Sequence, residues 1–322
     1  MMRITLRAAW LLTVWALTLP VHAAEAEAML ERMQRAARSL DYDGTFIYQH
    51  GNQLESFRIV HRGTGTSGAR ERLISLNGTP REIIRNDREV RCYLPDEKTV
   101  LVEPRRPGDQ SFPSLLPGSF AALNAHYKFR SGQEERVAGR KSRVVAIWPR
   151  DAYRFGYRLW TDEDSGLLLK AQLIDDRGKT IEQYLFTQIS IGKPIVDADL
   201  RPQGSNHSLA NKISETTTST SATRWGVLRL PPGFLLTAHT ARHPPAQREP
   251  AEQLVYSDGL AVVSVFVELA GVSGSPAALA GPTQIGAVHA FGKVVNGHQI
   301  TVVGAVPAVT VNLMGESVSE QR

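Results

Sequence analysis

The chain has 322 residues, enough for about two domains, and its composition of 42% hydrophobic and 21% charged residues excludes a wholly disordered protein. The formal net charge is +5, and the arginines that carry most of it are dispersed, without a block of five or more Lys and Arg residues. This pattern argues against a nucleic-acid-binding surface and is compatible, at low specificity, with anionic partners such as lipid headgroups.

The first 23 residues have the pattern of a secretory signal peptide. A positively charged start, MMRITLR, precedes an apolar run from Ala8 to Leu19, and a small-residue site ends at Ala23. The apolar run is too short to anchor the chain in a bilayer. We therefore predict cleavage after Ala23 and export. The one cysteine, Cys92, excludes an intrachain disulfide, and we expect it to be a small buried hydrophobic residue.

Residues 24–190 are predicted to form a large, mainly antiparallel β domain that begins with a helix. Apolar residues recur at spacings of three and four from Ala24 to Leu40, which is typical of an amphipathic helix. From Asp43 onward, short strands alternate with turn residues, and this pattern favours an antiparallel meander over βαβ units. We expect a Pro-rich loop at Pro104–Pro117 and a short helix at Gly118–His126. A sheet of roughly ten strands must curl, so we predict an unclosed barrel or half-barrel around the first helix.

The stretch Tyr153–Leu173 is the clearest hairpin in the sequence. Aromatic and apolar residues at every second position of 153–159 give its first strand one apolar face, and a turn at 161–166 leads into a second strand from Leu167. Such a face is covered by a core helix, by another sheet or by a ligand that is not protein. Ordinary core packing is the most common of these cases.

Residues 191–224 are predicted to be a linker, and residues 225–322 a smaller α+β domain. The linker contains a polar tract at Ser214–Ser221 without apolar periodicity. In the small domain, Ser257-Asp258-Gly259 and Asn296-Gly297 are typical of tight turns between paired strands. A closing helix is expected at Val306–Val318. The predicted unit is a twisted antiparallel sheet with one helix.

The sequence lacks the common catalytic and nucleotide-binding motifs, among them H-E-x-x-H, G-x-S-x-G, the P-loop, G-x-G-x-x-G and C-x-x-C. The acidic run Asp162-Glu163-Asp164 lacks the glycine and terminal glutamate of a calcium loop, so a solvated turn fits it better than a cation site. His239 and His243 are four apart, but Pro244 follows at once, which disfavours a helical metal pair. We predict no metal, no cofactor and no enzymatic activity. A triad of distant residues, as in an exported esterase, stays open as an alternative.

Three separated stretches resemble the MucB/RseB family of periplasmic regulators of the extracytoplasmic-stress sigma factor. They are Asp41–Arg62, Tyr153–Leu173 and Ser257–Glu268, and they occur in this order across both predicted domains. The resemblance implies that the large domain is similar to the lipoprotein carriers of the periplasm, with an unclosed barrel around a hydrophobic cavity. It also implies that the small domain helps to hold the periplasmic segment of a membrane-spanning anti-sigma factor. By the same resemblance, binding shields that segment from a protease, and lipid or lipopolysaccharide-type ligands release it.

The alternation of side chains along the predicted strands selects two sets of candidate site residues, although core packing is the commoner fate for each. An acyl chain in the large domain would contact some of Trp148, Tyr153, Phe155, Tyr157, Leu159 and Leu169. An extended peptide added to an exposed edge of the small sheet would contact some of Tyr256, Val263, Phe266 and Phe291. The main alternative is a periplasmic lipoprotein or lipid carrier, against which the extra residues from Trp225 onward argue. Homo-oligomerisation is left open by the sequence.

Overall fold

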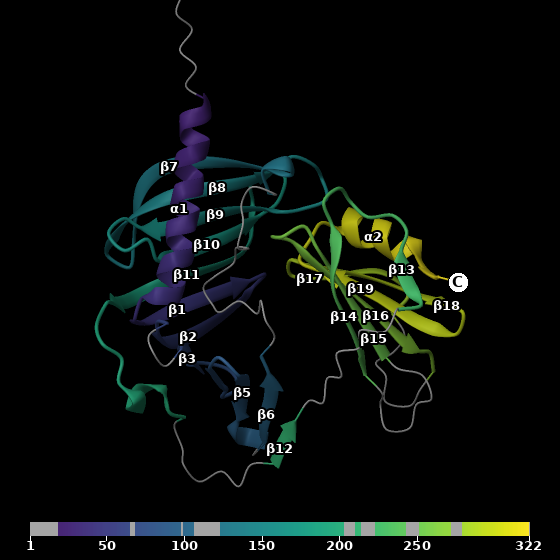
Figure 1. Ribbon diagram of the computed structural model, residues 1–322, viewed down its shortest axis with the longest axis horizontal. Helices are drawn as coiled ribbons and strands as arrows, with labels where there is room; N and C mark the ends of the chain where they lie inside the picture. The colour runs from purple at the N-terminus through teal and green to yellow at the C-terminus, as the bar shows by residue number, and fades with distance from the viewer. Residues whose placement is uncertain are drawn as a thin grey trace, which may run out of the picture.

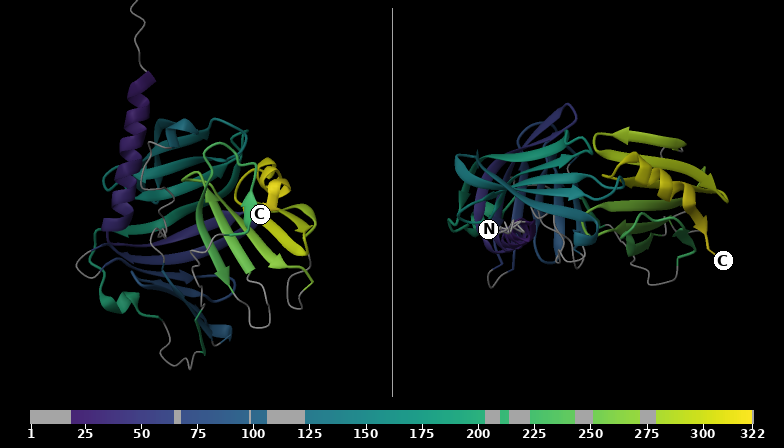
Figure 2. Two further views of the ribbon diagram at one scale, coloured as in Figure 1. Left: turned by 45° about the vertical axis from the view of Figure 1, so that its right-hand side comes forward. Right: turned by 90° about the horizontal axis from the view of Figure 1, so that it is seen from above.

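The computed structural model describes residues 19–64, 68–97, 99–105, 123–202, 210–213, 223–242, 251–271 and 279–321 (Figure 1). These residues include one twelve-stranded sheet and one six-stranded sheet, and each sheet packs against one α-helix. We call the parts built around the two sheets the large domain and the small domain. The two domains lie side by side (Figure 2). The predicted fold class, mainly antiparallel β with α, is confirmed.

The large sheet consists of β1 (Tyr42–His50), β2 (Gln53–Arg62), β3 (Arg70–Ser75), β4 (Glu82–Arg85), β5 (Glu89–Leu94), β6 (Thr99–Pro104), β7 (Tyr127–Val137), β8 (Arg140–Pro149), β9 (Gly156–Asp162), β10 (Leu168–Ile174), β11 (Thr180–Ile191) and β12 (Ala210–Ile213). Its order is β12-β6-β5-β4-β3-β2-β1-β11-β10-β9-β8-β7. Two antiparallel meanders, β1–β6 and β7–β11, join where β1 pairs with β11. The sheet is unclosed, with β12 and β7 at its edges, as the half-barrel prediction requires.

The helix α1 (Leu19–Ser39) runs across one face of the large sheet and packs mainly on β7 (Figure 1). We call this face the inner face. Ala26, Leu30 and Met33 form a buried stripe on the helix, at the spacing expected for one side of an α-helix. This stripe belongs to a core that includes Tyr42 and Phe186 from the paired strands β1 and β11. The helix begins before the predicted Ala24 and continues through the predicted cleavage site.

The small domain contains β14 (Leu235–Arg242), β15 (Ala251–Ser257), β16 (Val262–Leu269), β17 (Gly281–Ile285), β18 (Val288–Val295) and β19 (His298–Gly304). Their order is β14-β15-β16-β19-β18-β17. The predicted closing helix is confirmed as α2 (Ala308–Ser317), which packs on β18 and β19 beside the pair β13 (Trp225–Val227) and β20 (Val318–Glu320). Asn296 and Gly297 turn between β18 and β19 with φ of 48° and 76°, both positive, as a type I′ turn requires.

The predicted linker contains structure that the sequence pattern did not indicate. The 3₁₀ turn η3 (Asp197–Leu200) buries Leu200, and β12 adds to the large sheet by parallel pairing with β6. Backbone pairing at a sheet edge needs no side-chain periodicity, so the polar composition of this segment gave no signal for it. Of the helix predicted at Gly118–His126, the described part is the 3₁₀ turn η2 (Leu123–Ala125). Residues 106–117 of the Pro-rich loop and the tract Ser214–Ser221 lie outside the described residues.

The hairpin prediction was right in its pairing and wrong in where its first strand begins. The strand β9 starts at Gly156, after a bend at residues 151–155 in which the Asp151 carboxylate accepts a hydrogen bond from the Tyr153 backbone N–H at 3.0 Å. A side chain that satisfies a nearby backbone N–H favours a turn over an extended strand. Leu159 and Trp160 point to opposite faces of β9, and both are buried. Each face of β9 therefore contains buried residues, and neither face is fully exposed to solvent.

Candidate functional site

The six predicted acyl-chain candidates do not line one cavity. Leu159 and Leu169 are fully buried in the core beneath α1, and the half-buried Tyr157 packs against the same core. Trp148 points to the opposite face of the sheet, since its neighbour Ile147 stands opposite Tyr157 in the β8–β9 pair. Tyr153 and Phe155 lie at the contact between the domains.

The contact around Phe155 joins the hairpin to the small domain. Phe155 and Leu173 form a buried cluster with Ala287, and the Phe155 and His289 rings lie 6.2 Å apart. The Thr310 hydroxyl of α2 donates a hydrogen bond to the Tyr153 carbonyl oxygen at 2.6 Å. The apolar face that the sequence offered for a ligand is thus shared between the large-domain core and the neighbouring domain.

Three of the four predicted partner-binding residues lie in or on the small-domain core. Tyr256 and Val263 are buried, and the half-buried Phe291 packs against the same core. Phe266 is half-buried on the other face of β16. Because β16 pairs with β15 on one side and β19 on the other, it is an inner strand and cannot accept a further strand. The described edges of this sheet are β14 and β17.

The central polar contact between the domains is a buried ion pair. Nη1 of Arg154, in the large domain, lies 3.2 Å from Oδ2 of Asp258, in the small domain, and both side chains are 0% exposed. The Tyr127 hydroxyl donates to the same carboxylate oxygen at 2.9 Å. Oδ1 of Asp258 accepts the backbone N–H groups of Leu260 and Ala261 at 2.8 and 2.7 Å. One carboxylate therefore shapes a hairpin tip and ties it to the other domain.

The guanidinium of Arg154 makes further contacts with both domains. It donates to the Pro232 carbonyl oxygen at 2.5 Å, and its Cζ lies over the rings of Tyr127 and Phe234, 5.5 and 5.2 Å from their centroids. Leu260, at the tip of the β15–β16 hairpin, packs into the core of the large domain. We call Arg154, Asp258, Tyr127 and Phe234 the interdomain junction.

A cavity of about 690 Å³ opens between the domains close to this junction. Its walls come from the β1–β2 turn, from β11 and the segment before it, and from the β17–β18 hairpin. The apolar part of the lining includes Phe155 and Ile181, and the polar part includes Lys179, Glu182 and His289. Because both domains supply walls, the shape of this cavity depends on how the domains are held together.

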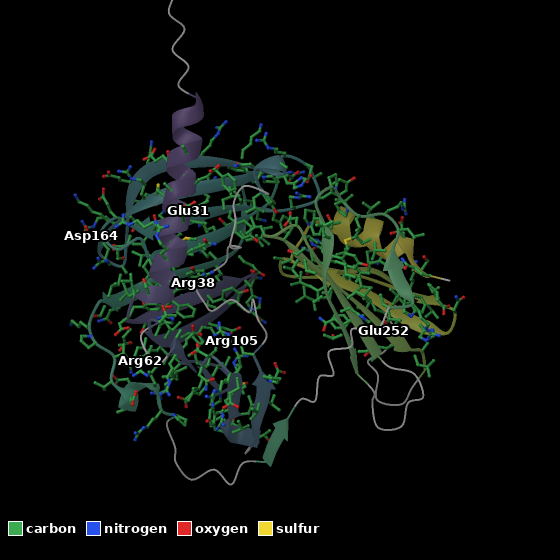
Figure 3. All side chains as sticks on the ribbon, viewed as in Figure 1. Glu31, Arg38, Arg62, Arg105, Asp164 and Glu252 are labelled. Atoms are coloured by element: carbon green, nitrogen blue, oxygen red, sulfur yellow. The ribbon has the colours of Figure 1, made fainter. Side chains whose placement is uncertain are left out.

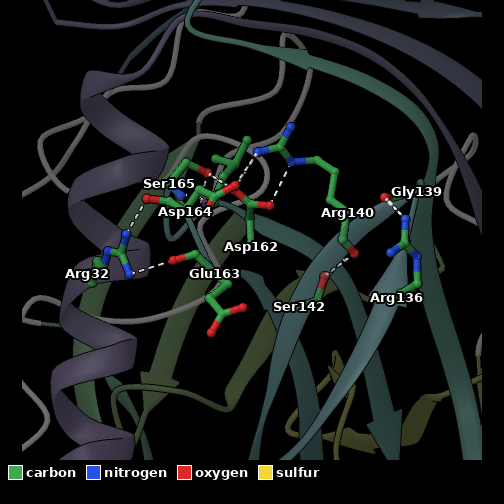
Figure 4. A network of polar contacts seen from close by, with 10 residues as sticks. Arg32, Arg136, Gly139, Arg140, Ser142, Asp162, Glu163, Asp164 and Ser165 are labelled. Atoms are coloured by element: carbon green, nitrogen blue, oxygen red, sulfur yellow. Dashed lines mark hydrogen bonds and ion pairs between the residues drawn. The ribbon is translucent and has the colours of Figure 1, made fainter.

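A second polar network anchors α1 to the turn between β9 and β10 (Figure 4). Arg32 donates to the backbone oxygens of Glu163 and Asp164, and Arg140 binds both carboxylate oxygens of Asp162 at 2.6 and 3.0 Å. Burial raises the pKa of Asp162, but the hydrogen bonds from Arg140 and Ser165 outweigh it and hold the pKa below its usual range. The acidic run was predicted to be a solvated turn, and this is wrong for Asp162, whose side chain is 1% exposed.

Replacing Arg140 with alanine is expected to destabilise the protein by about 1–3 kcal/mol at pH 7, because Asp162 then stays buried with fewer partners. The lowered pKa of Asp162 stabilises the fold above its ordinary pKa, and this contribution is lost as the pH falls through the folded-state pKa. Urea denaturation at pH 7 and pH 3 should therefore show a smaller deficit at pH 3. Arg136→Ala removes an exposed arginine nearby and should change little; an equal loss in both variants would contradict this role.

A row of polar side chains crosses the inner face of four neighbouring strands: Tyr42, His61, Glu71 and Arg85. The Tyr42 and His61 rings stack with centroids 4.6 Å apart, and Arg85 lies 3.2 Å from Glu71. Burial raises the pKa of Glu71 to about 7, although Arg85 and Arg105 act in the opposite direction. Burial also lowers the pKa of His61, although its hydrogen bond with the Leu40 carbonyl opposes this.

The geometry offers little support for catalysis. Glu252 lies in the small domain (Figure 3). Its carboxylate contacts the His239 imidazole at 2.8 Å and the Thr223 hydroxyl at 2.7 Å. The Thr223 hydroxyl donates to the carboxylate and not to the imidazole, so this set is no nucleophile–base–acid relay. Among the described residues there is no group of three or more His, Cys, Asp or Glu side chains placed to hold a metal ion. Neither described helix has the length and hydropathy needed to cross a bilayer.

The sequence did not single out Arg154 or Asp258 as functional residues. Arg154 falls between the apolar positions of the predicted strand, which in fact starts after it, and Asp258 was predicted only to be a turn residue. The one available signal was that both residues fall within stretches that carry the family resemblance. Their pairing depends on the arrangement of the two domains, which no local pattern encodes.

Comparison with known proteins matches both domains. The model of the MucB/RseB N-terminal domain matches residues 25–204, and that of the MucB/RseB C-terminal domain matches residues 219–319. The sigma factor AlgU regulatory protein MucB of Pseudomonas aeruginosa is 33% identical over 302 residues, covering 92% of this chain and 91% of that protein. The sigma-E factor regulatory protein RseB of Escherichia coli K12 is 28% identical over 295 residues, covering 90% and 89%.

Solved structures give the same result. The structure of the Pseudomonas aeruginosa MucA/MucB complex has a TM-score of 0.72 at 30% identity and covers 92% of this chain and 99% of that chain. The crystal structure of MucB has a TM-score of 0.64 at 28% identity and covers 92% of this chain and 98% of that chain. Since the family models and these relatives span nearly the whole chain and both of its sheets, this protein belongs to the MucB/RseB family.

Proposed function

We propose that this chain is a periplasmic negative regulator that binds the periplasmic part of a membrane-spanning anti-sigma factor. By shielding that segment from proteolysis, it restrains an envelope-stress sigma factor. The observation that carries the proposal is the similarity, across both domains, to MucB, which has been solved in complex with MucA. The relatives are named as regulatory proteins, in agreement with a binding role.

Export fits the structure of the first helix. We propose that cleavage after Ala23 releases the mature chain, whose helix would still contain the buried residues from Ala26 onward. The core contacts of α1 therefore do not depend on the signal peptide. The mass of the protein recovered from periplasm tests this, since a chain that begins at Met1 would contradict it.

We propose β14 as the strand to which the anti-sigma segment adds. Within the described residues, β14 pairs on one side only, with β15, so its other edge can offer backbone groups. Leu235 and Leu236 on this strand are 68% and 46% exposed. An edge strand with exposed apolar side chains can bind an extended peptide through backbone hydrogen bonds and side-chain contacts together. Among the sequence candidates, the half-buried Phe266 is still placed to contribute on the same sheet.

Hydrogen exchange with and without a purified periplasmic fragment of the anti-sigma factor tests both the function and the site. Exchange in Leu235–Arg242 is expected to slow by about tenfold or more on binding, because unpaired edge amides become hydrogen-bonded. Exchange in Val262–Leu269 should change little, since this inner strand is already paired on both sides. Protection in another segment would move the site. If a saturating concentration of the fragment protects no segment of the chain, the proposed function is overturned.

For the lipid ligand, we propose the inner face of β3–β6. Four half-buried residues stand side by side on these four strands: Leu73, Ile83, Cys92 and Leu101. Cys92 was expected to be buried and is only half-buried. Each acyl CH₂ that leaves water contributes about 0.8 kcal/mol. Longer fatty acids should therefore bind more tightly, and a titration with chains of increasing length measures this.

A further inference from the structure

We propose that Arg154 and Asp258 form a latch that fixes the arrangement of the two domains, and that this latch couples the lipid and partner sites. The coupling half of the proposal rests on the proposed function, whereas the latch half does not. The argument begins with the burial of the pair. Both side chains are 0% exposed, yet the residues come from different domains. The ion pair therefore exists only while the domains are together.

Removing the Asp258 carboxylate leaves the Arg154 guanidinium buried, with the partly exposed Asp151 carboxylate 3.4 Å from its Nε as the remaining ion-pair partner. A buried charge with so little compensation is unfavourable. In a single core the chain would have to accept that charge or unfold. Here a third state exists, since separation of the domains would let water reach Arg154 without unfolding either sheet. The physical expectation is that loss of the Asp258 charge shifts the protein toward separated domains.

The contacts around the pair concentrate at this one point. Arg154 contacts one aromatic ring of each domain, Tyr127 and Phe234, and donates to the Pro232 carbonyl of the small domain. Beside it the backbone of Gly233 approaches His126 so closely that a Cβ at that position would lie 2.2 Å from the imidazole Nε2. These contacts define a single docked position, and not a surface over which the domains could slide.

The position of the latch also suits a coupling role. The proposed partner strand β14 follows directly after Phe234, and the Asp258 hairpin tip connects β15 and β16. The proposed lipid face lies on the other domain. A ligand at one site can affect a partner at the other only through a difference between two states of the protein. Docked and separated domains are two such states, and the latch sets the balance between them.

Asp258→Asn is the sharpest test, because asparagine keeps the Oδ1 acceptor that caps Leu260 and Ala261 while removing the charge. Two spin labels, at the exposed positions Leu76 and Val294 in a Cys92→Ala background, report the distance between the domains. The unmodified junction should give one narrow distance distribution. Asp258→Asn and Arg154→Met should broaden it and shift it to other distances.

Asp151→Asn is the matched control, since Asp151 also faces Arg154, at 3.4 Å, but belongs to the same domain. Its distance distribution should stay close to that of the parent protein. Unchanged distributions in both Asp258→Asn and Arg154→Met, with the fold intact by circular dichroism, would overturn the latch. If Arg154→Met fails to fold, Asp258→Asn decides alone, because its turn contacts are preserved.

The coupling is measured by the fatty-acid concentration that releases half of a captured anti-sigma fragment. A fivefold or larger change in Asp258→Asn relative to Asp151→Asn is expected, which is the lower end of typical coupling factors. If Asp258→Asn alters the spin-label distances but not the fatty-acid concentration that releases the fragment, the coupling is overturned and the latch stands. Failure of the parent protein to capture the fragment would overturn the proposed function, while the distance measurement would still decide the latch.

Discussion

Replacing Trp225 with alanine is expected to destabilise the small domain by about 3–5 kcal/mol, the usual range for a large buried aromatic side chain. Trp225 is 1% exposed and is the largest side chain in the small-domain core. Its ring meets His298 edge-on at 5.1 Å, and its backbone forms part of β13, which pairs with β20 at the end of the chain. The substitution removes this packing and leaves a cavity that the paired strands cannot readily close.

Urea denaturation followed by circular dichroism measures this effect. The variant should show an early transition from the small domain, with the large sheet melting later. Leu228→Ala, in the same segment but 68% exposed, is the control and should stay within about 0.5 kcal/mol of the parent protein. Trp225→Phe keeps an apolar ring, so its loss of stability should lie between those of Trp225→Ala and Leu228→Ala. A loss for Trp225→Ala no larger than that for Leu228→Ala would contradict the assigned core.

Replacing Glu71 with glutamine is expected to remove a pH dependence of stability of about 3 kcal/mol, from the difference between the ordinary pKa of 4.5 and the folded value of about 7. A carboxyl whose pKa is raised by folding binds its proton more tightly in the folded state. Its contribution to stability is complete below pH 4.5 and is lost as the pH rises through about 7. The parent protein should therefore lose stability across this window relative to Glu71→Gln.

Comparing the two proteins at each pH isolates Glu71 from its neighbours. His61 acts in the opposite direction, because its lowered pKa favours the neutral ring and removes stability as the pH falls. Arg85 and Arg105 both lower the pKa of Glu71, and solvent partly screens the field of Arg85 because its side chain is partly exposed. Chemical denaturation at pH 5, 6, 7 and 8 gives the profile. A difference between the proteins that stays constant with pH would show that Glu71 is ionised throughout.

The parts of the fold that could be predicted from the sequence depend on short-range chemistry. Asn296-Gly297 predicts a tight turn because few other residue pairs accept two consecutive positive φ angles, and the apolar spacing of Leu30, Met33 and Ala37 predicts a helix with one buried face. Both were found. The start of β9 was misplaced because the Asp151 side chain creates a bend that period-two alternation cannot detect.

The candidate site was harder to predict for a physical reason. An apolar strand face can pack in a core, against a second domain or against a ligand, and the strand sequence alone does not decide which. In this protein, one hairpin supplies residues both to the core and to the contact with the second domain. Leu159 is buried in the core of the large domain, whereas Phe155 packs against the small domain. Arg154 precedes Phe155 in the same hairpin. It makes the main polar contact between the domains because the fold of the small domain places Asp258 next to it.

The measurement that tests the central claim most directly is capture from periplasm-plus-membrane extract with the mature protein, followed by elution with fatty acid and identification by mass spectrometry. The account predicts that the anti-sigma factor is captured and that acyl-chain lipid elutes it. Capture of lipoproteins in place of the anti-sigma factor, with lipid acting only as a competitor, would contradict it and would make this chain a carrier with an appended domain.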